Sequence, residues 1–187
     1  MADVLGCMVT MRFAYADPPY LGQSRRHYGR EEVPHECLIP HLVNAYPDGW
    51  ALSCSSPSLS ELLLLCPSDV RVMAWFKPFC SFKPGVGVAY AWEPVIVRGG
   101  RRRTRQQQTV RDWVSCNITM QRGTIGAKPE AFCAWLFQLL GLRPGDEFTD
   151  IFPGSGAVQQ SWETYRDSPT IPLTATERRE ALVLRIT

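Results

Sequence analysis

Apolar positions along the chain fall into short runs whose spacing alternates between that of strands and that of helices. Short segments rich in apolar residues predict strands at 12–16, 50–55, 70–76, 88–97 (broken by Pro94) and 147–152, and a further short strand within 111–118. Helical spacing predicts helices at 35–46, 58–66, 128–142 and 157–166. This alternation favours an α/β fold with a mostly parallel sheet and helices on both faces.

The helix signals differ in kind along the chain. Residues 128–142 carry the clearest one, an apolar face followed by Gly141, which can end a helix. That face consists of Phe132, Trp135, Leu136, Leu139 and Leu140. Ser58 with Glu61 three residues later predicts a capping box at the start of the second helix. Pro40 is expected to bend or split the first helix.

Composition bounds the class of protein. A chain of 187 residues with 45% hydrophobic and 20% charged residues is expected to form a single globular domain over 1–187. The seven cysteines are odd in number and form no CxxC pair, which favours free thiols in a reducing cytoplasm over disulfides or a metal site. No signal peptide and no apolar run of membrane-spanning length is visible, so we expect a cytoplasmic protein without a membrane partner.

Two loops can each place unusual residues against a ligand. The DPPY tetrapeptide at 17–20 ends the first strand, and the DIFPGSGAV segment at 150–158 leads from a strand into a helix. Glycines let a backbone approach a ligand closely, and a helix N-terminus presents free N–H groups. Either loop alone is also typical of an ordinary turn. Because ligands of parallel sheets bind at the carboxyl ends of strands, the two loops together indicate a ligand site there.

Three segments carry a resemblance to a known family. They are ADPPY (16–20), AKPEAFCAWLFQLLGLRPGDEFTDIFPGSGAV (127–158) and, more weakly, WFKPF…AYAWEPVIV (75–97). They resemble S-adenosylmethionine-dependent amino-methyltransferases that modify adenine N6 or cytosine N4, in the circularly permuted order that begins with DPPY. The middle segment is the most specific, with a Lys-Pro opening a helix, a Pro-Gly-Asp turn, and a strand ending Asp-x-Phe-x-Gly-Ser-Gly. The resemblance implies a Rossmann-like methyltransferase fold, S-adenosyl-L-methionine as cofactor, and nucleic acid, DNA rather than RNA, as partner.

The resemblance also implies roles for individual residues. The catalytic loop would consist of Asp17, Pro18, Pro19 and Tyr20. The cofactor would be bound by Lys128, Asp150, Phe152, Gly154, Ser155 and Gly156. In this scheme Asp150 accepts from the ammonium of the methionine moiety, and Lys128 reaches its carboxylate or is a solvated residue of the first helical turn. An Asp at the first position of DPPY favours adenine N6 over cytosine N4.

The chemistry of the adenine amine gives a physical reason for the DPPY loop. The lone pair of this amine is delocalised into the ring, so the nitrogen must become more tetrahedral before it attacks a methyl sulfonium. Hydrogen-bond acceptors on both N–H groups favour that change, and the Asp17 carboxylate and Pro18 carbonyl can supply them. Tyr20 offers a face on which a base flipped out of a helix can stack.

One basic segment, RGGRRRTRQQQTVR at 98–111, lies between the predicted core elements. It has no acidic residue and no apolar face, so we expect a mobile arm. Its guanidinium groups are candidates for phosphate contacts, and the alternative is an ordinary solvated loop. The arginines in question are Arg98, Arg101, Arg102, Arg103, Arg105 and Arg111.

The chain departs from the family pattern in two places. No strand ending in an acid that could bind the ribose hydroxyls follows Gly156; ALVLRI (181–186) is either a strand without the acid or the end of a helix, and Glu163 and Asp167 are possible substitutes. No separate target-recognition domain is visible, which allows a homodimer or a partner subunit. We therefore consider three hypotheses for the function: a DNA adenine-N6 methyltransferase, a non-catalytic nucleic-acid-binding or partner subunit, and an RNA adenine-N6 or cytosine-N4 methyltransferase.

Overall fold

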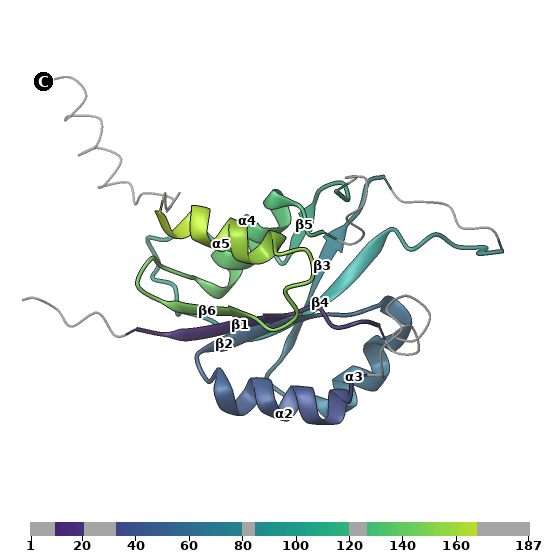
Figure 1. Ribbon diagram of the computed structural model, residues 1–187, viewed down its shortest axis with the longest axis horizontal. Helices are drawn as coiled ribbons and strands as arrows, with labels where there is room; N and C mark the ends of the chain where they lie inside the picture. Colours follow the sequence, from purple (N-terminus) through teal and green to yellow (C-terminus); the bar gives the residue numbers. More distant parts are fainter. Residues whose placement is uncertain (1–9, 21–32, 80–84, 120–126, 168–187) are drawn as a thin grey trace, which may run out of the picture.

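Six strands form one sheet through the middle of the molecule (Figure 1). The computed structural model describes residues 10–20, 33–79, 85–119 and 127–167. In sheet order the strands are β5 (Trp113–Ser115), β3 (Arg71–Phe76), β4 (Trp92–Gly99), β2 (Gly49–Ser53), β1 (Arg12–Ala16) and β6 (Glu147–Asp150). Each corresponds to a strand expected from the apolar pattern.

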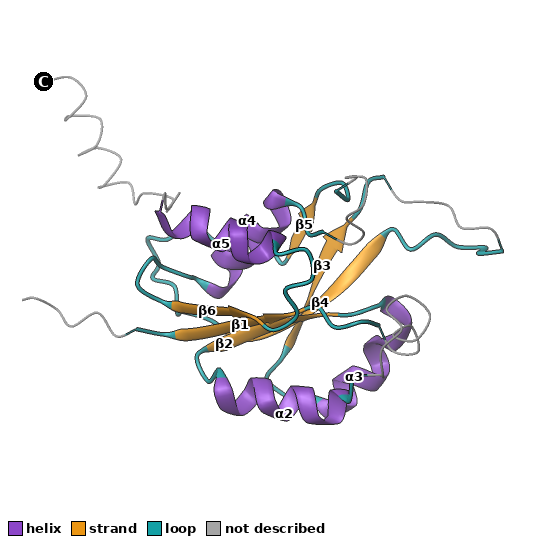
Figure 2. Cartoon of the chain, viewed as in Figure 1, coloured by secondary structure: helices purple, strands orange, loops and turns teal. Residues whose placement is uncertain are grey.

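Helices cover both faces of the sheet, as Figures 1 and 2 show. One face carries α4 (Glu130–Leu140) and α5 (Ala157–Asp167); the other carries α2 (His35–Ala45), the short 3-10 turn η1 (Ser56–Ser58) and α3 (Leu59–Leu65). Each face has its own hydrophobic core. In the α4 core the Phe132 ring lies 5.9 Å from Tyr15, 5.1 Å from Trp75 and 5.7 Å from Trp135, measured between ring centroids. The predicted α/β fold with helices on both faces is confirmed.

Strand β4 is the single strand that runs against the others in the described sheet. β1 pairs in parallel with β2 and β6, and β3 with β5, whereas β4 is antiparallel to both β2 and β3. The sheet is therefore mostly parallel, as predicted. Because of its direction, β4 begins at the edge where β1 and β6 end, and it delivers the following chain to the opposite edge.

Neither proline that was expected to interrupt an element does so. β4 starts only at Trp92, and Pro94 lies inside it, where its carbonyl accepts from the Cys54 N–H at 3.1 Å. α2 runs unbroken through Pro40, which faces solvent. A proline removes one N–H donor, and here neighbouring hydrogen bonds and packing outweigh that loss.

The two predicted helix-end signals have different outcomes. Gly141 ends α4 in the left-handed conformation, with φ +72°, as the sequence indicates. Ser58 is not the side-chain cap of α3, so the predicted capping box is wrong. Because η1 precedes α3, the Ser58 backbone is already helical instead of extended, and its hydroxyl bonds the Ser55 hydroxyl at 2.7 Å.

The basic segment 98–111 packs against the sheet and α4 over its first residues. Arg98 belongs to β4, and its Nε lies 2.8 Å from Asp69 Oδ1. The Arg101 N–H donates to the Leu140 carbonyl, and its guanidinium lies 2.6 Å from Asp146 Oδ1. Asp146 also accepts from the Met11 N–H just before β1. The first residues of this segment are thus tied to the sheet and to α4 by these contacts, whereas the composition had predicted a mobile arm.

The Arg101–Asp146 pair gives a stability prediction. Arg101→Gln should lower the free energy of unfolding by about 2–3 kcal/mol, because the Asp146 side chain is only 3% exposed and would keep its charge without the cation that pairs with it. Arg102→Gln is the matched control, since Arg102 is exposed and should change stability by less than about 0.5 kcal/mol. Urea denaturation of both variants checks this, and equal losses would contradict it.

Candidate functional site

The two predicted ligand loops lie at the same edge of the sheet. The DPPY loop follows β1 and the glycine-rich loop follows β6, which is its parallel neighbour. The register pairs Tyr15 with Asp150, so Asp17 begins its loop beside the end of β6. Pro18 is buried, and Asp17 and Tyr20 are partly exposed. The structure therefore brings together residues separated by more than a hundred positions, as expected for parallel strands.

Lys128 places a buried ammonium group at this edge. Its Nζ lies 3.0 Å from Asp17 Oδ1 and 2.6 Å from Glu93 Oε1, and its side chain is 6% exposed. The same nitrogen lies 5.2 Å from the centroid of the Trp75 ring and 5.5 Å from that of Phe132, which limits access of water. The solvated alternative for Lys128 is thus wrong. Both of its ionic partners belong to the site, and one of them is the predicted catalytic carboxylate.

Glu93 is the residue of this charge cluster that sequence reasoning missed. It comes from β4, is buried, and uses both oxygens: Oε1 accepts from Lys128, while Oε2 accepts from the Tyr20 hydroxyl at 2.7 Å and from Lys77 Nζ at 2.8 Å. The available signal was an acid inside the apolar run AYAWEPVIV, where an unpaired carboxylate would be costly. The spacing gave no hint of its partners, because they come from three other segments.

The electrostatics of this cluster follow from burial and charge pairing. Burial raises the pKa of Asp17, and the Glu93 charge adds to the rise, while Lys128 opposes it. Burial also tends to raise the pKa of Glu93, but the charges of Lys128 and Lys77 outweigh this effect and hold the pKa at about 2. The two carboxylates keep the pKa of Lys128 above its usual value despite burial. Burial, with the charges of Glu93 and Asp17, likewise raises the pKa of Tyr20, which is a neutral donor.

Asp150 is the second carboxylate at this edge, and its surroundings differ. It forms no ion pair within the described residues, and its Oδ1 accepts only a long hydrogen bond, 3.3 Å, from the Phe152 N–H. Burial raises the pKa of Asp150 to about 6; the Phe152 N–H opposes this rise and the charge of Asp17 adds to it. The nearby Lys128 also opposes the rise, but it forms no ion pair with Asp150, and a partly buried carboxylate without such a pair is suited to receive a cation.

The glycine-rich loop that follows Asp150 has an open backbone at its glycines. Gly154 and Gly156 have φ values of +48° and +76°, and a side chain built on Gly156 would meet nothing within 4 Å. Positive φ favours glycine here, and the open backbone can approach a ligand. Ser155 serves the start of α5, where its hydroxyl oxygen accepts from the Ala157 N–H at 3.4 Å. Phe152 packs against the core on the α2 face.

The possible substitutes for a ribose-binding acid lie on the surface of α5. Glu163 accepts from Gln159, and Asp167 pairs with Arg166, so both are engaged within their own helix. β6 is the edge strand of the described sheet on this side. The segment 181–186 lies outside the described residues.

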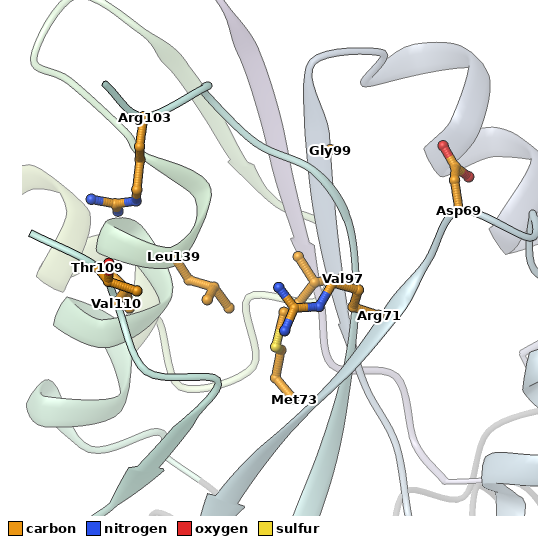
Figure 3. A pocket seen from close by; sticks show the side chains of 9 residues that line it. All are labelled: Asp69, Arg71, Met73, Val97, Gly99, Arg103, Thr109, Val110 and Leu139. Carbon is orange, nitrogen blue, oxygen red and sulfur yellow. The ribbon is translucent and has the colours of Figure 1, made fainter. Parts of the chain in front are cut away.

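The basic segment 98–111 does not flank this edge over its first residues. Arg98 and Arg101 sit at the amino ends of β2, β3 and β6, because antiparallel β4 carries the chain there. Arg103 donates to the Gln138 and Gln108 carbonyls and, with Arg71, lines a cavity of about 250 Å³ (Figure 3). This cavity also lies at the amino end of β3, away from Asp17.

The remaining arginines of the segment show no ion pair among the described residues. Arg111 lies over the Trp113 ring, 5.1 Å from its centroid. Arg102 and Arg105 are exposed.

The sequence also predicted no metal site, no disulfide and no membrane-spanning segment. Among the described residues no group of three or more His, Cys, Asp or Glu side chains is placed to hold a metal ion. The five described cysteines, Cys37, Cys54, Cys66, Cys116 and Cys133, are free thiols. In the same part of the chain, no helix has the length and apolar character needed to cross a bilayer.

Comparison with solved structures identifies the fold. The crystal structure of the M1.HpyAVI–SAM complex is similar to this chain with a TM-score of 0.56 and 13% sequence identity, covering 83% of this chain and 79% of that one. A second crystal structure of M1.HpyAVI gives a TM-score of 0.54 at 12% identity, covering 84% and 77%. The chain has a Rossmann-like methyltransferase fold. No protein-family model matches the sequence, and no curated protein is significantly similar to it.

The buried charge cluster predicts a pH-dependent effect of removing Lys128. Lys128→Met should lower the free energy of unfolding by about 3–5 kcal/mol near neutral pH, because the buried Glu93 and the partly buried Asp17 would lose their shared cation. Burial would then raise both pKa values above those of the unfolded chain. The folded variant would lose stability as pH rises through these values, so its deficit should be larger at about pH 8 than at about pH 5.

Lys77→Met is the matched control for this measurement. Lys77 also contacts Glu93 but is more exposed, at 18%, and its loss leaves the Asp17–Lys128 pair in place. We expect a smaller deficit and a weaker pH dependence in thermal or urea denaturation. Equal deficits in the two variants, or a Lys128→Met deficit that does not change with pH, would contradict the assigned charge pairing.

Proposed function

We propose that this chain is an S-adenosylmethionine-dependent methyltransferase that transfers a methyl group to the N6 amine of adenine in DNA. The observation that carries the proposal is the convergence of Asp17 and Asp150 at one edge of a methyltransferase fold. Asp17 is anchored by a buried cation, whereas Asp150 borders an open glycine backbone. One carboxylate is thus suited to the amine that reacts and the other to the cofactor.

The residues around Asp150 fit the methionine end of the cofactor. Its carboxylate, without an ion pair in the described residues, can accept from an ammonium group, and the positive-φ turns at Gly154 and Gly156 leave room for a ligand on the backbone. The M1.HpyAVI structure with the same fold holds SAM. When bound, S-adenosylmethionine supplies an electrophilic methyl group on a sulfonium. The contacts of Lys128 favour a role in holding Asp17 over a role at the cofactor carboxylate.

The DPPY loop prepares the adenine amine for attack. The Asp17 carboxylate and the Pro18 carbonyl accept hydrogen bonds from the two N–H groups, which favours a tetrahedral nitrogen with its lone pair free. Lys128 keeps Asp17 in place, so little reorganisation is needed as charge develops on the nitrogen. The Tyr20 hydroxyl is tied to Glu93, which orients the ring for stacking on a base.

The choices of adenine and of DNA rest on the DPPY resemblance. An Asp at position 17 supports adenine N6, and RNA adenine-N6 or cytosine-N4 methylation is the alternative within the same chemistry. Arg102 and Arg105 remain the candidates in segment 98–111 for phosphate contacts, because they are exposed and form no ion pair among the described residues.

A second function is favoured by one observation. β6 is the edge of the described sheet. After Gly156 the described chain forms only α5, so it provides no strand next to β6 that could carry a ribose-binding acid. This supports a non-catalytic nucleic-acid-binding or partner subunit with weak cofactor binding. Calorimetric titration with S-adenosylmethionine separates the two functions, since the subunit would bind it weakly or not at all.

Replacing Asp17 tests the catalytic role. Asp17→Ala should reduce methyl transfer by about 100-fold or more, because a preorganised acceptor worth roughly 3 kcal/mol in the transition state is lost. Asp17→Asn keeps the shape and one neutral acceptor, so its loss should be smaller. Tritium-methyl transfer to single- and double-stranded DNA and RNA measures this. The affinity of Asp17→Ala for S-adenosylmethionine should stay nearly unchanged. Substantial turnover by the folded variant would show that Asp17 is not needed for methyl transfer.

Asp150 predicts a pH-dependent affinity for the cofactor. Because burial raises its pKa to about 6, protonation below that pH removes the negative charge, and S-adenosylmethionine binding should weaken as pH falls through about 6. Asp150→Asn should weaken binding by about 1.5–3 kcal/mol at neutral pH and flatten this dependence. Asp69→Asn, at the opposite edge, is the control and should bind like the parent. If calorimetry shows the same pH dependence of S-adenosylmethionine affinity in the parent and in Asp150→Asn, the ammonium of the cofactor does not bind Asp150.

A further inference from the structure

Glu93 is a buried carboxylate that the proposed chemistry does not use directly. It comes from β4, which is separated from β1 by β2, so its side chain reaches the DPPY loop across an intervening strand. Its side chain is 3% exposed and both oxygens are engaged. A carboxylate in such a place costs free energy unless its partners are fixed, which calls for an explanation beyond packing.

The two oxygens of Glu93 connect to both ends of the same loop. Oε2 accepts from the Tyr20 hydroxyl at 2.7 Å. Oε1 accepts from Lys128 at 2.6 Å, and Lys128 in turn lies 3.0 Å from Asp17. Asp17 and Tyr20 are the first and last residues of the DPPY loop, so one carboxylate restrains the whole loop.

We propose that Glu93 is a positioning residue for methyl transfer, which fixes the Tyr20 ring through its hydroxyl and fixes Asp17 through the shared ammonium of Lys128. The inference rests on the proposed function. It adds Glu93, which lies on β4 outside both ligand loops, to the residues of the proposed active site. Glu93 touches neither the base nor the cofactor; it acts through Tyr20 and Lys128. Lys77, 2.8 Å from Oε2 and 4.5 Å from the Trp75 ring centroid, balances its charge.

The charge of Glu93 also sets how strongly Lys128 acts on Asp17. The charged or titratable groups that face Asp17 are Lys128, Glu93, Lys77, Asp150, Tyr15 and Tyr20. With Glu93 neutral, Lys128 would be attracted by Asp17 alone, and Asp17 would become more acidic and a weaker acceptor. With Lys77 removed, the opposite change would follow.

The test compares Glu93→Gln with Lys77→Met in the full-length chain. Carboxyl carbon NMR of Asp17 should show its pKa lowered in Glu93→Gln and raised in Lys77→Met, because the two variants change the charge beside Lys128 in opposite directions. In the tritium-methyl assay, kcat of Glu93→Gln should fall about 10- to 100-fold, while KM for S-adenosylmethionine stays near the parent value. Tyr20→Phe should lower kcat as well, and its effect should be much less than additive with that of Glu93→Gln.

The NMR readout does not depend on methyl transfer. An Asp17 pKa that is unchanged in Glu93→Gln, or shifts of the same sign in both variants, overturns the inference and leaves Glu93 a packing residue. If Glu93→Gln does not fold, Lys77→Met decides, since an unchanged Asp17 pKa in that variant overturns the inference too. A protein with the expected shifts and no methyl transfer on any substrate would refute the proposed function and keep the assignment of Glu93 to the loop.

Discussion

The candidate site depends on the burial of one ammonium group between two carboxylates. Lys128 precedes α4, Asp17 follows β1, and Glu93 lies on β4, so the cluster joins three elements distant in sequence. Each charge would be costly to bury alone, and Lys128 stabilises both carboxylates at once. The DPPY loop, the start of α4 and the start of β4 are therefore fixed relative to one another by a single electrostatic constraint.

The direction of β4 decides what lies at each edge of the sheet. Because β4 is antiparallel, its first residues, including Glu93, lie at the edge of the sheet where β1 and β6 end. Its last two residues begin the basic segment 98–111 at the opposite edge, where Arg101 pairs with Asp146. One reversed strand thus supplies a carboxylate to the site and carries the first arginines of the segment away from it.

The two sides of the site differ in how their charges are satisfied. On the Asp17 side every charge has a partner, which holds the loop in one arrangement. On the Asp150 side the carboxylate accepts one long hydrogen bond among the described residues, and the loop that follows it has an open glycine backbone. The proposed methyl transfer uses this difference: the anchored Asp17 would hold the amine, and Asp150 would receive the cationic end of the cofactor.

The sequence by itself determined the elements of the fold and the two ligand loops. Apolar periodicity located the strands and helices, and local motifs located Asp17, Asp150 and the glycines, because these signals arise between residues close in the chain. Three local predictions were wrong: the prolines in α2 and β4 do not interrupt these elements, and Ser58 does not cap α3. In each case neighbouring elements outweighed the local preference.

Only the tertiary structure decided the direction of β4, the partners of Glu93 and the place of Arg101. Each depends on contacts between segments far apart in sequence, and the cost of burying a charge is a property of the assembled core, not of any local stretch.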